Sequence, residues 1–491
     1  MKILTNGKIS GTTTPVEIQI EKNKIQSIQP LHKDSTLPKI NLNGHYVFPG
    51  FIDSHSHILH TGLQLQKTDL FNCQNKQELL QKILEEAQQS PKTEWVILKN
   101  YDPSLLEAKD HLTQQDLDQI DPYKPILIQH SSGHAGVASS RALALAPSVK
   151  HIQGYLVEKE YEKVYSKEPI PSLEKMIKSI LAAGAKMSQL GITCATEMMA
   201  GYYDLEQELL AYHLASKRGS PIRVRLFLEW NKIFGPEAIS EGRLRELMDQ
   251  MDQDLCKVVG IKLFADGALG TKTAAVNEEY IGGGYGHLLY EPDIFKEKVK
   301  TAHQAGWPIA VHSIGDRATG MVLEAFSELD DATSHRIEHV MILSDAQIKK
   351  MARLGCSCTL QPEFLSHFAE SYQKNIGKKR TAKLKRFRSI LDSGIKISLS
   401  SDRPFSPGNP WDAIHIASHR PQGFDPSENI SLQEALVAYT KSPAALHHEE
   451  DLFGKLKPGY FADLQIYAED PLTSHASLPL TTFLGGKEAV K

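Results

Sequence analysis

The sequence predicts an α/β protein whose main part is a (β/α)8 TIM barrel, with a small β-sandwich domain built from both termini and an insertion after the first barrel strand. Three observations support this prediction. A helix–glycine–strand pattern repeats through the middle of the chain, eight apolar segments have the length of strands, and both ends carry short β segments. Repeated strand–helix units favour parallel pairing, and eight such units close a barrel.

The repeating pattern begins at residues 171–191, "PSLEKMIKSILAAGAKMSQLG". Apolar residues recur there at helical spacing, Gly191 is placed to end the helix, and the apolar strand "ITCATEM" follows at once. The same order recurs in "HLASKRGSPIRVRLFLEW", "VKTAHQAGWPIAVH", "KKMARLGCSCTLQP" and "SILDSGIKISLSSD". The segments "GFIDSHSH", "GIKLFADG" and "SHRIEHV" supply the remaining strands.

The eight expected strands set the domain boundaries. They end near residues 57, 197, 229, 263, 312, 339, 360 and 402. After the second strand, most spacings of about 20 to 50 residues allow one helical crossover each. Residues 64–170 do not fit this spacing and hold strands of their own, "WVILKN" and "PILIQHSSGH". We therefore expect a barrel domain over residues 50–449 with an inserted subdomain at about 64–170.

Both ends of the chain contain short strand-like segments separated by turns, as in a small β domain. "KILTNGKI" and "VEIQIEKNKIQSIQPL" lie near the start, and "GKLKPGYFADLQIYAEDPL" lies near the end. Asn6 and Gly7, between apolar runs, predict a hairpin turn. Residues 1–49 and 450–491 are expected to form one β-sandwich domain.

Composition narrows the function classes. The 491 residues are 41% hydrophobic and 23% charged, with a formal net charge of −4, which gives no electrostatic reason to expect nucleic acid or an anionic membrane as partner. No secretory h-region and no apolar run of membrane-spanning length is evident. Five scattered cysteines, including Cys356 and Cys358, suit free thiols in a reduced compartment. We expect a cytoplasmic protein and leave a homodimer open.

In barrels of this kind the chemistry lies at the C-terminal ends of the strands. The first strand, in "FPGFIDSHSHILH", ends in His55 and His57, which share one face because strand side chains alternate. Two imidazoles on one face are unfavourable in a core, since each ring nitrogen needs a partner, but they are well suited to a metal ion. By itself the pair leaves a metal site and a polar strand-to-loop junction equally open.

Later strand ends carry further polar side chains, namely Glu197, Glu229, Lys262, His312, His339 and Asp402. Each has an ordinary alternative: a lone histidine is more often structural, Asp402 before "RP" suits a turn, and Lys262 could reach solvent. Their coincidence at one rim favours a shared site instead. By strand alternation Lys262 groups with Phe264 and Asp266, and a lysine directed into a barrel needs a partner or a modification.

Seven motifs in order make the chain resemble the amidohydrolase superfamily: "PGFIDSHSH", "SSGHAGVASSRAL", "KLFADGALGTKTA", "VHSIGDRA", "RIEHV", "SSDRP" and "GKLKPGYFADL". The resemblance covers nearly the whole chain and is greatest to amidohydrolase family 3, which includes N-substituted formamide deformylases and YtcJ-like metal-dependent hydrolases. It implies an enzyme that hydrolyses a linear, non-peptide C–N amide or N-acyl bond, such as an N-formyl bond, of a small molecule.

The resemblance also implies a set of metal ligands: His55, His57, Lys262, His312, His339 and Asp402. The first two histidines would bind a buried ion with Asp402, and the later two would bind a more exposed ion. Lys262 would be carboxylated and bridge the ions. A bridging water would be the nucleophile, because coordination lowers its pKa, and Asp402 would pass its proton to the leaving amine. Zinc suits these ligands, and other divalent ions stay open.

Four residues are expected to bind substrate or orient the ligands. His134 would contact substrate from the insertion or cap a turn, and Glu197 would bind a ligand or, as the preferred alternative, be a buried structural carboxylate. Asp266 and Arg317 lie just beyond ligand positions and would orient them. The role of Asp53 is open. The remaining histidines without a motif position are expected to be structural or surface residues, namely His60, His335, His447 and His448.

Two other functions stay open. The same scaffold could carry a mononuclear deaminase or cyclic-amide hydrolase, in which Lys262 would have no bridging role and His339 would serve catalysis. A barrel that has lost catalysis and acts as a regulatory protein is the third alternative, and no feature of the sequence supports it.

Overall fold

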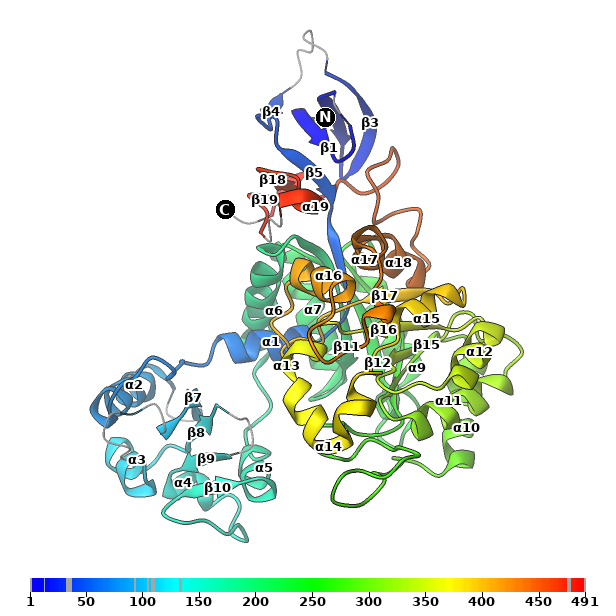
Figure 1. Cartoon of the computed structure of the whole chain (residues 1–491). Coiled ribbons are helices and arrows are strands. Elements are labelled where there is room, and N and C mark those ends of the chain that lie inside the picture. Colours follow the sequence, from blue (N-terminus) through cyan, green and yellow to red (C-terminus); the bar gives the residue numbers. More distant parts are fainter. Residues whose placement is uncertain are drawn as a thin grey trace. The chain divides into compact units, whose positions relative to one another are not determined.

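The structure is a computed structural model that describes residues 2–12, 14–31, 38–91, 94–103, 106, 111–131, 135–474 and 478–489. Contacts within the chain divide it into two compact units. The first consists of Met1–Gly62 with Met176–Lys491, and the second is Leu63–Lys175 (Figure 1). The second unit is therefore inserted into the first, shortly after its first barrel strand.

The barrel of the first unit consists of β6 (Phe51–Ser56), β11 (Ile192–Ala200), β12 (Arg223–Glu229), β13 (Cys256–Phe264), β14 (Ile309–Ser313), β15 (Arg336–His339), β16 (Ser357–Leu360) and β17 (Ile397–Leu399). All neighbouring strands are parallel, and their order in the sheet follows the chain. The sheet closes where residues after β17 meet β6: the Asp402 N–H donates to His55 O at 2.7 Å, and the His57 N–H donates to Arg403 O at 2.8 Å. The predicted (β/α)8 barrel is confirmed.

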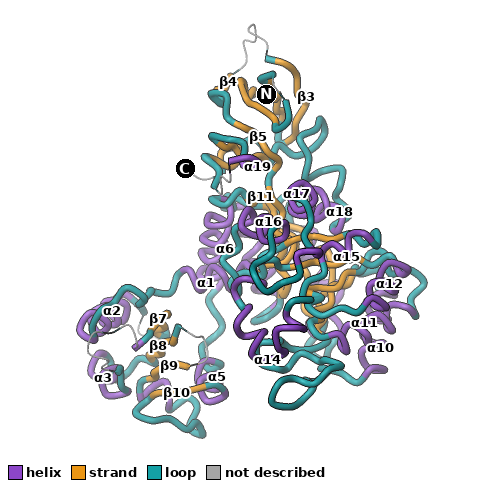
Figure 2. The backbone as a smooth tube through the Cα atoms, in the orientation of Figure 1, coloured by secondary structure: helices purple, strands orange, loops and turns teal. Residues whose placement is uncertain are grey.

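Helices surround these strands, as Figure 2 shows. They are α1 (Ile58–Leu65), α6 (Leu173–Ser188), α7 (Leu205–Lys217), α8 (Asn231–Phe234), α9 (Glu241–Gln250), α10 (Pro292–Gln304), α11 (Asp316–Ser327), α12 (Asp345–Leu354), α13 (Phe364–His367), α14 (Ala369–Thr381), α15 (Phe387–Asp392), α16 (Pro410–Ser418), α17 (Leu432–Tyr439) and α18 (Lys441–Leu446).

Helix α6 illustrates how the sequence pattern becomes packing. Its periodic apolar residues, such as Met176 and Ile180, are buried. Gly191 follows at φ +82°, which ends the turn before β11 in a left-handed conformation. A Cβ atom at Gly191 would lie 2.0 Å from Gln465 Oε1, so only glycine fits where the C-terminal strands approach.

The terminal β segments come from both ends of the chain. They are β1 (Lys2–Ile9), β2 (Val16–Glu21), β3 (Lys24–Pro30), β4 (Lys39–Asn41), β5 (Tyr46–Pro49), β18 (Leu464–Tyr467), β19 (Thr481–Leu484) and β20 (Lys487–Glu488). Strand β5 pairs with β1 on one side and with β18 on the other, and side chains from both ends share one apolar core. The short helix α19 (Pro471–Ser474) connects two of the C-terminal strands.

The hairpin expected at Asn6 and Gly7 is wrong. Both residues lie inside β1, where the pairing with β2 shifts register between Leu4 and Gly7. Asn6 has a φ of 58°, so the "NG" sequence produces an irregularity within a continuous strand. A Cβ atom at Gly7 would lie 2.9 Å from Val47, which explains the need for glycine there.

The second unit has a sheet and cores of its own. Its strands β7 (Val96–Tyr101), β8 (Ile126–His130), β9 (Ala135–Ala138) and β10 (Tyr155–Val157) form a sheet in the order β10–β9–β8–β7. Its helices are α2 (Lys76–Gln89), α3 (Gln114–Ile120), α4 (Ser140–Leu143) and α5 (Lys159–Tyr165). Two apolar clusters, one including Leu98 and Ile128 and the other Leu127 and Leu156, hold it together.

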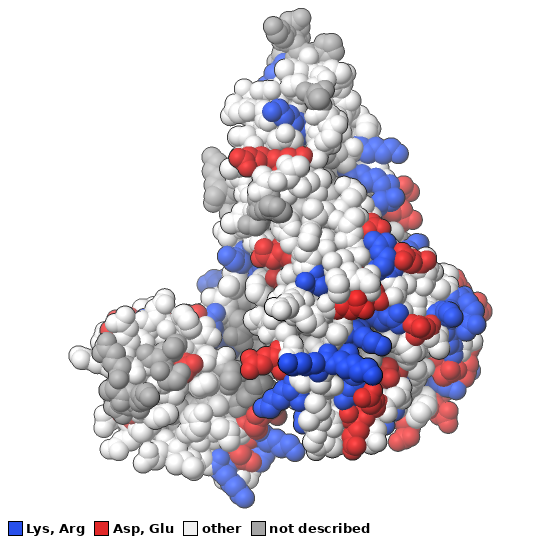
Figure 3. Space-filling view, in the orientation of Figure 1, with Lys and Arg blue, Asp and Glu red and all other residues white. Residues whose placement is uncertain are grey.

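Surface features agree with the bulk composition. Figure 3 shows positive and negative side chains interspersed over the visible face of the barrel. Among the helices of the described ranges, none is both long and apolar enough to cross a membrane. The five cysteines are buried free thiols.

Candidate metal centre

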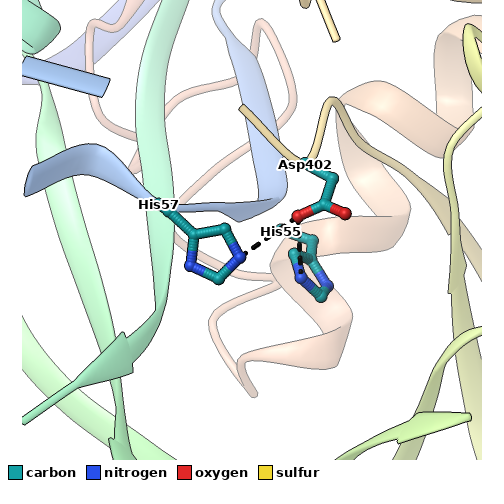
Figure 4. Close-up of side chains that lie close together, drawn as sticks. All are labelled: His55, His57 and Asp402. Atoms are coloured by element: carbon teal, nitrogen blue, oxygen red, sulfur yellow. Dashed lines mark ion pairs between the residues drawn. The ribbon is translucent and has the colours of Figure 1, made fainter. Parts of the chain in front are cut away.

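Three side chains converge at the C-terminal end of the barrel. His55 and His57 come from the end of β6, and Asp402 follows β17. Asp402 Oδ1 lies 3.3 Å from Nε2 of His55 and 3.2 Å from Nε2 of His57 (Figure 4). All three residues are buried, and one ligand atom from each lies within 4.8 Å of the others. Two imidazoles and a carboxylate are a donor set that suits zinc and similar divalent ions.

Hydrogen bonds to the neighbouring Ser401 and an unusual backbone conformation fix the position of Asp402. Asp53, on β6, accepts hydrogen bonds from the Ser401 backbone at 3.0 Å and from its hydroxyl at 2.5 Å, which ties the last strand end to the first. Asp402 itself has a φ of 57°, and His339 has a φ of 72°. Left-handed backbone at a non-glycine residue costs free energy and concentrates at functional sites. Asp53 therefore has a structural role, which the sequence left open.

Each histidine of the first pair has a carboxylate behind it. His55 Nδ1 lies 2.6 Å from Glu338 Oε2, and His57 Nδ1 lies 3.6 Å from Glu197 Oε1. Glu338 also pairs with Arg336 at 2.6 Å. Such partners fix the ring orientation and leave Nε2 for a metal ion. Sequence analysis missed Glu338, although its alternation with Arg336 along "RIEH" placed both inside the barrel.

The ionisation states of these histidines and of the carboxylates around them depend on one another. Burial lowers the pKa of His57, but the nearby carboxylates of Asp402 and Glu197 outweigh it and raise the pKa to about 9. Burial would raise the pKa of Asp402, but the surrounding histidines hold it well below its usual value. Burial likewise opposes ionisation of Glu338, while Arg336 and His55 lower its pKa to about 2. Both carboxylates are therefore ionised at neutral pH.

A second pair of histidines lies beside the first. The ring centroid of His339 is 4.7 Å from that of His55 and 4.5 Å from that of His312. Both have neutral partners: His312 Nε2 lies 3.0 Å from Gly267 O, and His339 Nδ1 lies 3.0 Å from Gln361 Oε1. Burial, with the charge of Lys262, lowers the pKa of His312 to about 3. This pair lies outside the group of ligand atoms formed by the first three residues.

Lys262 is fully buried beneath this cluster. Its Nζ has no hydrogen-bond partner within the described part of the chain and lies 4.9 Å from the centre of the Phe264 ring. Burial lowers its pKa to about 8, although Glu338 and Asp402 raise it. A buried ammonium group without a hydrogen bond is costly. Carboxylation of Lys262, with metal ions on the resulting carbamate, would remove this cost, so the residue fits the expected two-metal centre.

A buried lysine supports His339 from behind, which the sequence did not indicate. Lys385 Nζ donates to Gln361 Oε1 at 2.7 Å and to His339 O at 2.9 Å. Gln361 Nε2 in turn donates to Ser400 Oγ at 3.0 Å. Gln361 directly follows the seventh strand in "TLQP", so its position at the rim could have been predicted, whereas Lys385 lies in a loop with no sequence signal.

The four residues expected to bind substrate or orient ligands have different surroundings. His134 lies outside the described residues. Glu197 is buried and accepts hydrogen bonds from Tyr212 Oη at 2.5 Å and from the Leu59 N–H at 3.2 Å, in addition to its contact with His57. These contacts match the structural alternative for Glu197.

Asp266 and Arg317 organise the loops around His312. Asp266 accepts hydrogen bonds from the backbone of Ala275, Ile314 and Gly315, and Oδ1 lies 3.8 Å from His312 Nε2. Burial raises its pKa to about 7. Arg317 donates to Gly286 O at 3.2 Å.

A cavity of 220 Å³ opens beside the second histidine pair. It is lined by Ala268, Leu269, Gly270, His312, Ile314, His339, Phe364, Phe368, Tyr372, Asp402 and Phe405. A substrate in this cavity would therefore reach three of the proposed metal ligands.

Comparison with known proteins agrees with the geometry. A model of the amidohydrolase family matches residues 39–490. The amidohydrolase YtcJ of Bacillus subtilis is 28% identical over 462 residues, 88% of this chain and 86% of that protein. N-substituted formamide deformylase of Arthrobacter pascens is 24% identical over 469 residues, 88% of this chain and 85% of that protein. An uncharacterized metal-dependent hydrolase from Pyrococcus furiosus has a similar crystal structure, with a TM-score of 0.80, 26% identity and coverage of 96% of this chain and 100% of that chain.

Proposed function

The chain belongs to the amidohydrolase family and is a hydrolase acting on carbon–nitrogen bonds, and from that premise we propose that it cleaves a linear amide or N-acyl bond of a small molecule at a two-metal centre. The observation that carries the two-metal proposal is the buried Nζ of Lys262, which lies near two histidine pairs and has no hydrogen-bond partner among the described residues. The name of the deformylase relative supports an N-formyl or other N-acyl substrate.

Carboxylation of Lys262 follows from its surroundings. Only a neutral amine adds to carbon dioxide, forming the carbamate N–C bond and releasing a proton. Since burial lowers the pKa of Lys262 to about 8, a substantial neutral fraction exists near neutral pH. In this proposal His55, His57 and Asp402 would hold one ion, His312 and His339 would hold a second, and the modified Lys262 would supply a further ligand.

Bound divalent ions would supply a water of lowered pKa and polarisation of the scissile carbonyl. Asp402 would be the catalytic base and then the acid. It is ionised, Oδ1 faces the first histidine pair, and Oδ2 lies 3.9 Å from Nδ1 of His339, so its carboxylate spans both pairs. It would accept the proton of the attacking water and deliver it to the leaving amine, which departs as a neutral molecule. Zinc is the proposed metal.

The test combines metal analysis with a substrate panel. The protein should contain two divalent ions per chain, its intact mass should show one CO2 adduct under non-denaturing conditions, and it should hydrolyse members of a panel of N-formyl and N-acyl amides. One tightly bound ion with unmodified Lys262 would contradict the two-metal mechanism. Absence of hydrolysis across that panel would contradict the proposed bond type.

A mononuclear deaminase or cyclic-amide hydrolase is the second candidate. One observation favours it: among the described residues, His55, His57 and Asp402 are the only group of three or more metal-ligating side chains that can each bring one ligand atom within 4.8 Å of the others. In that case the deep ion would act alone, and His339 would serve as a proton carrier. A preference for cyclic amides or amino-substituted heterocycles in the same panel, with one ion per chain, would select it.

A further inference from the structure

Apart from the proposed metal ligands, the cavity beside the second histidine pair is lined almost entirely by apolar and aromatic side chains. Its wall consists of aromatic side chains from α13, α14 and the loop between them, namely Phe364, Phe368 and Tyr372, and of Phe405 at its mouth. Leu269 and Ile314 complete the apolar surface. Among the described lining residues, the acidic and basic side chains are Asp402, His312 and His339, which are all proposed metal ligands.

We propose that this cavity is the subsite for an uncharged, apolar substituent of the substrate, an aryl, benzyl or branched alkyl group that adjoins the scissile amide. The inference rests on the proposed function, since it takes the amide to lie at the metal centre. It goes beyond that function because it states which half of the substrate determines recognition and what chemistry that half must have.

The volume of the cavity matches an aromatic ring or a branched alkyl group. A cavity of about 150 Å³ is enough for a benzene ring, and this cavity measures 220 Å³. The space therefore admits one ring with a linking carbon, or a branched alkyl group of similar volume. A methyl or hydrogen substituent would leave most of the apolar wall in contact with water, which forgoes the free energy of burial.

The wall is built before a substrate arrives. Rings pack in series along it: Phe364 and Phe368 have centroids 5.1 Å apart, and Phe368 and Tyr372 have centroids 5.9 Å apart. Asn375 on α14 donates to Leu269 O and to Gly270 O, both at 2.8 Å, which fixes the opposite wall to the same helix. A preformed apolar pocket binds its ligand without a cost for ordering side chains.

Charge excludes the main alternative, a substituent that carries a carboxylate, as in an N-acyl amino acid. The cavity-lining residues within the described ranges include no lysine or arginine. Lys385 lies 5.4 Å from the Phe364 ring, but its hydrogen bonds go to Gln361 and to His339 O, and it does not line the cavity. With the amide or hydroxamate group at the metal ions, a carboxylate on the substituent would lose its hydration against the aromatic wall, where the described lining residues offer it no lysine or arginine.

Hydroxamic acids test the subsite without requiring turnover, because the hydroxamate group chelates metal ions and the substituent can be varied. The zinc-loaded protein is titrated with acetohydroxamic acid, phenylacetohydroxamic acid and succinic monohydroxamic acid by calorimetry. We expect the phenyl compound to bind at least 30-fold more tightly than the methyl compound, and the carboxylate compound to bind no more tightly than the methyl compound. Equal affinity for all three, or tightest binding of the carboxylate, would overturn the proposal.

Charge substitution in the wall sharpens the test. Phe368→Arg should abolish the advantage of the phenyl compound and raise the affinity for the carboxylate compound at least tenfold. Phe405→Arg at the mouth, where the residue is 57% exposed, should act in the same direction with a smaller effect. Tyr46→Arg, an aromatic residue of the terminal β segments that does not line the cavity, is the matched control and should change neither affinity.

The outcomes also separate this inference from the proposed function. If the phenyl compound binds tightly but no amide is hydrolysed, the subsite stands and the proposed reaction fails. If amides are hydrolysed with the same kcat/KM for phenyl-bearing and carboxylate-bearing substrates, the reaction stands and the subsite is refuted.

Discussion

The two histidine pairs of the metal centre lie at the same end of one barrel, yet their supports differ. His55 and His57 have carboxylates behind them, Glu338 and Glu197. His312 and His339 have neutral oxygens at 3.0 Å, from Gly267 and from Gln361. The Asp266 carboxyl group lies farther off, 3.8 Å from His312 Nε2, and burial raises its pKa to about 7. The pKa values of the two pairs differ accordingly. Neighbouring carboxylates raise the pKa of His57 to about 9 against the effect of burial, whereas burial and the charge of Lys262 lower the pKa of His312 to about 3.

This difference has a consequence for metal binding. An anionic partner makes an imidazole a stronger donor, and a neutral partner makes it a weaker one. We therefore expect a tightly held ion at the first pair and a more readily exchanged ion at the second, where substrate also enters.

Asp402 is the residue that both pairs share, so its loss should have the largest effect. Asp402→Asn keeps an oxygen near both pairs but cannot accept a proton at neutral pH. We expect kcat to fall about 10³-fold while most of the bound metal is retained. Steady-state kinetics and elemental analysis on the same sample provide the measurement. Activity within tenfold of the original would show that Asp402 is not the base.

Lys262 connects the pairs in the proposed centre. Lys262→Ala should lower activity at least 100-fold and release the ion at His312 and His339. Formate, acetate or propionate at millimolar concentration should restore part of the activity, because a small carboxylate can occupy the space and stand in for the carbamate. Lys262→Met fills that space and is the matched control, which should not be rescued. Rescue of both variants, or of neither, would contradict a bridging role.

Exchanging the partners of the two pairs tests the asymmetry directly. Glu197→Gln makes the partner of His57 neutral, and Gln361→Glu makes the partner of His339 anionic and places it against Lys385. The first variant should lose affinity for the deep ion by about 10- to 100-fold, and the second should hold the exchangeable ion more tightly. Competition with a chelator, followed as ions released per chain, measures both. Changes in the same direction would refute the link between partner charge and metal affinity.

The raised pKa of His57 gives a smaller, pH-dependent effect. Below pH 9 the metal-free protein holds a proton on His57 that a metal ion must displace, so affinity for the deep ion should rise about tenfold per pH unit toward pH 9. The stability of the metal-free fold has the opposite pH dependence. That proton stabilises the metal-free fold fully below the ordinary pKa of 6.5, and the stabilisation disappears as pH rises through about 9.

Urea unfolding of metal-free protein at pH 6.5 and pH 9, beside the same measurement on His57→Gln, isolates this contribution. The difference between the two pH values should be smaller in the variant. An unchanged difference would assign the pH dependence to other groups.

The barrel was predictable because its signals are local. Apolar periodicity, glycine at helix ends and strand length are properties of short segments, and a segment such as residues 171–191 keeps them in the fold. The "NG" signal failed for the opposite reason. Pairing of β1 with β2 and with the later strands β4 and β5 placed Asn6 and Gly7 inside a strand, and a two-residue sequence carries no information on these partners.

The motif histidines, Lys262 and Asp402 were identified from the sequence because each occupies a strand end, and parallel strands of one barrel bring their ends to one rim. The residues that hydrogen-bond to these side chains were not predicted from the sequence. Glu338 reaches His55 across 283 positions of sequence, and Lys385 reaches Gln361 across 24. Whether a carboxylate or an amide stands behind an imidazole depends on packing between strands and loops, which no single segment specifies.

The barrel, the family resemblance and the residues at the barrel rim could be predicted from the sequence, because they depend on periodicity and motif order along the chain. Three features became visible only in the folded chain. Lys262 Nζ is buried with no hydrogen-bond partner among the described residues, one histidine pair is backed by carboxylates while the other is hydrogen-bonded to neutral oxygens, and an apolar cavity opens beside the second pair. These properties arise from distances between residues remote in sequence, and electrostatic energies depend on such distances and on burial.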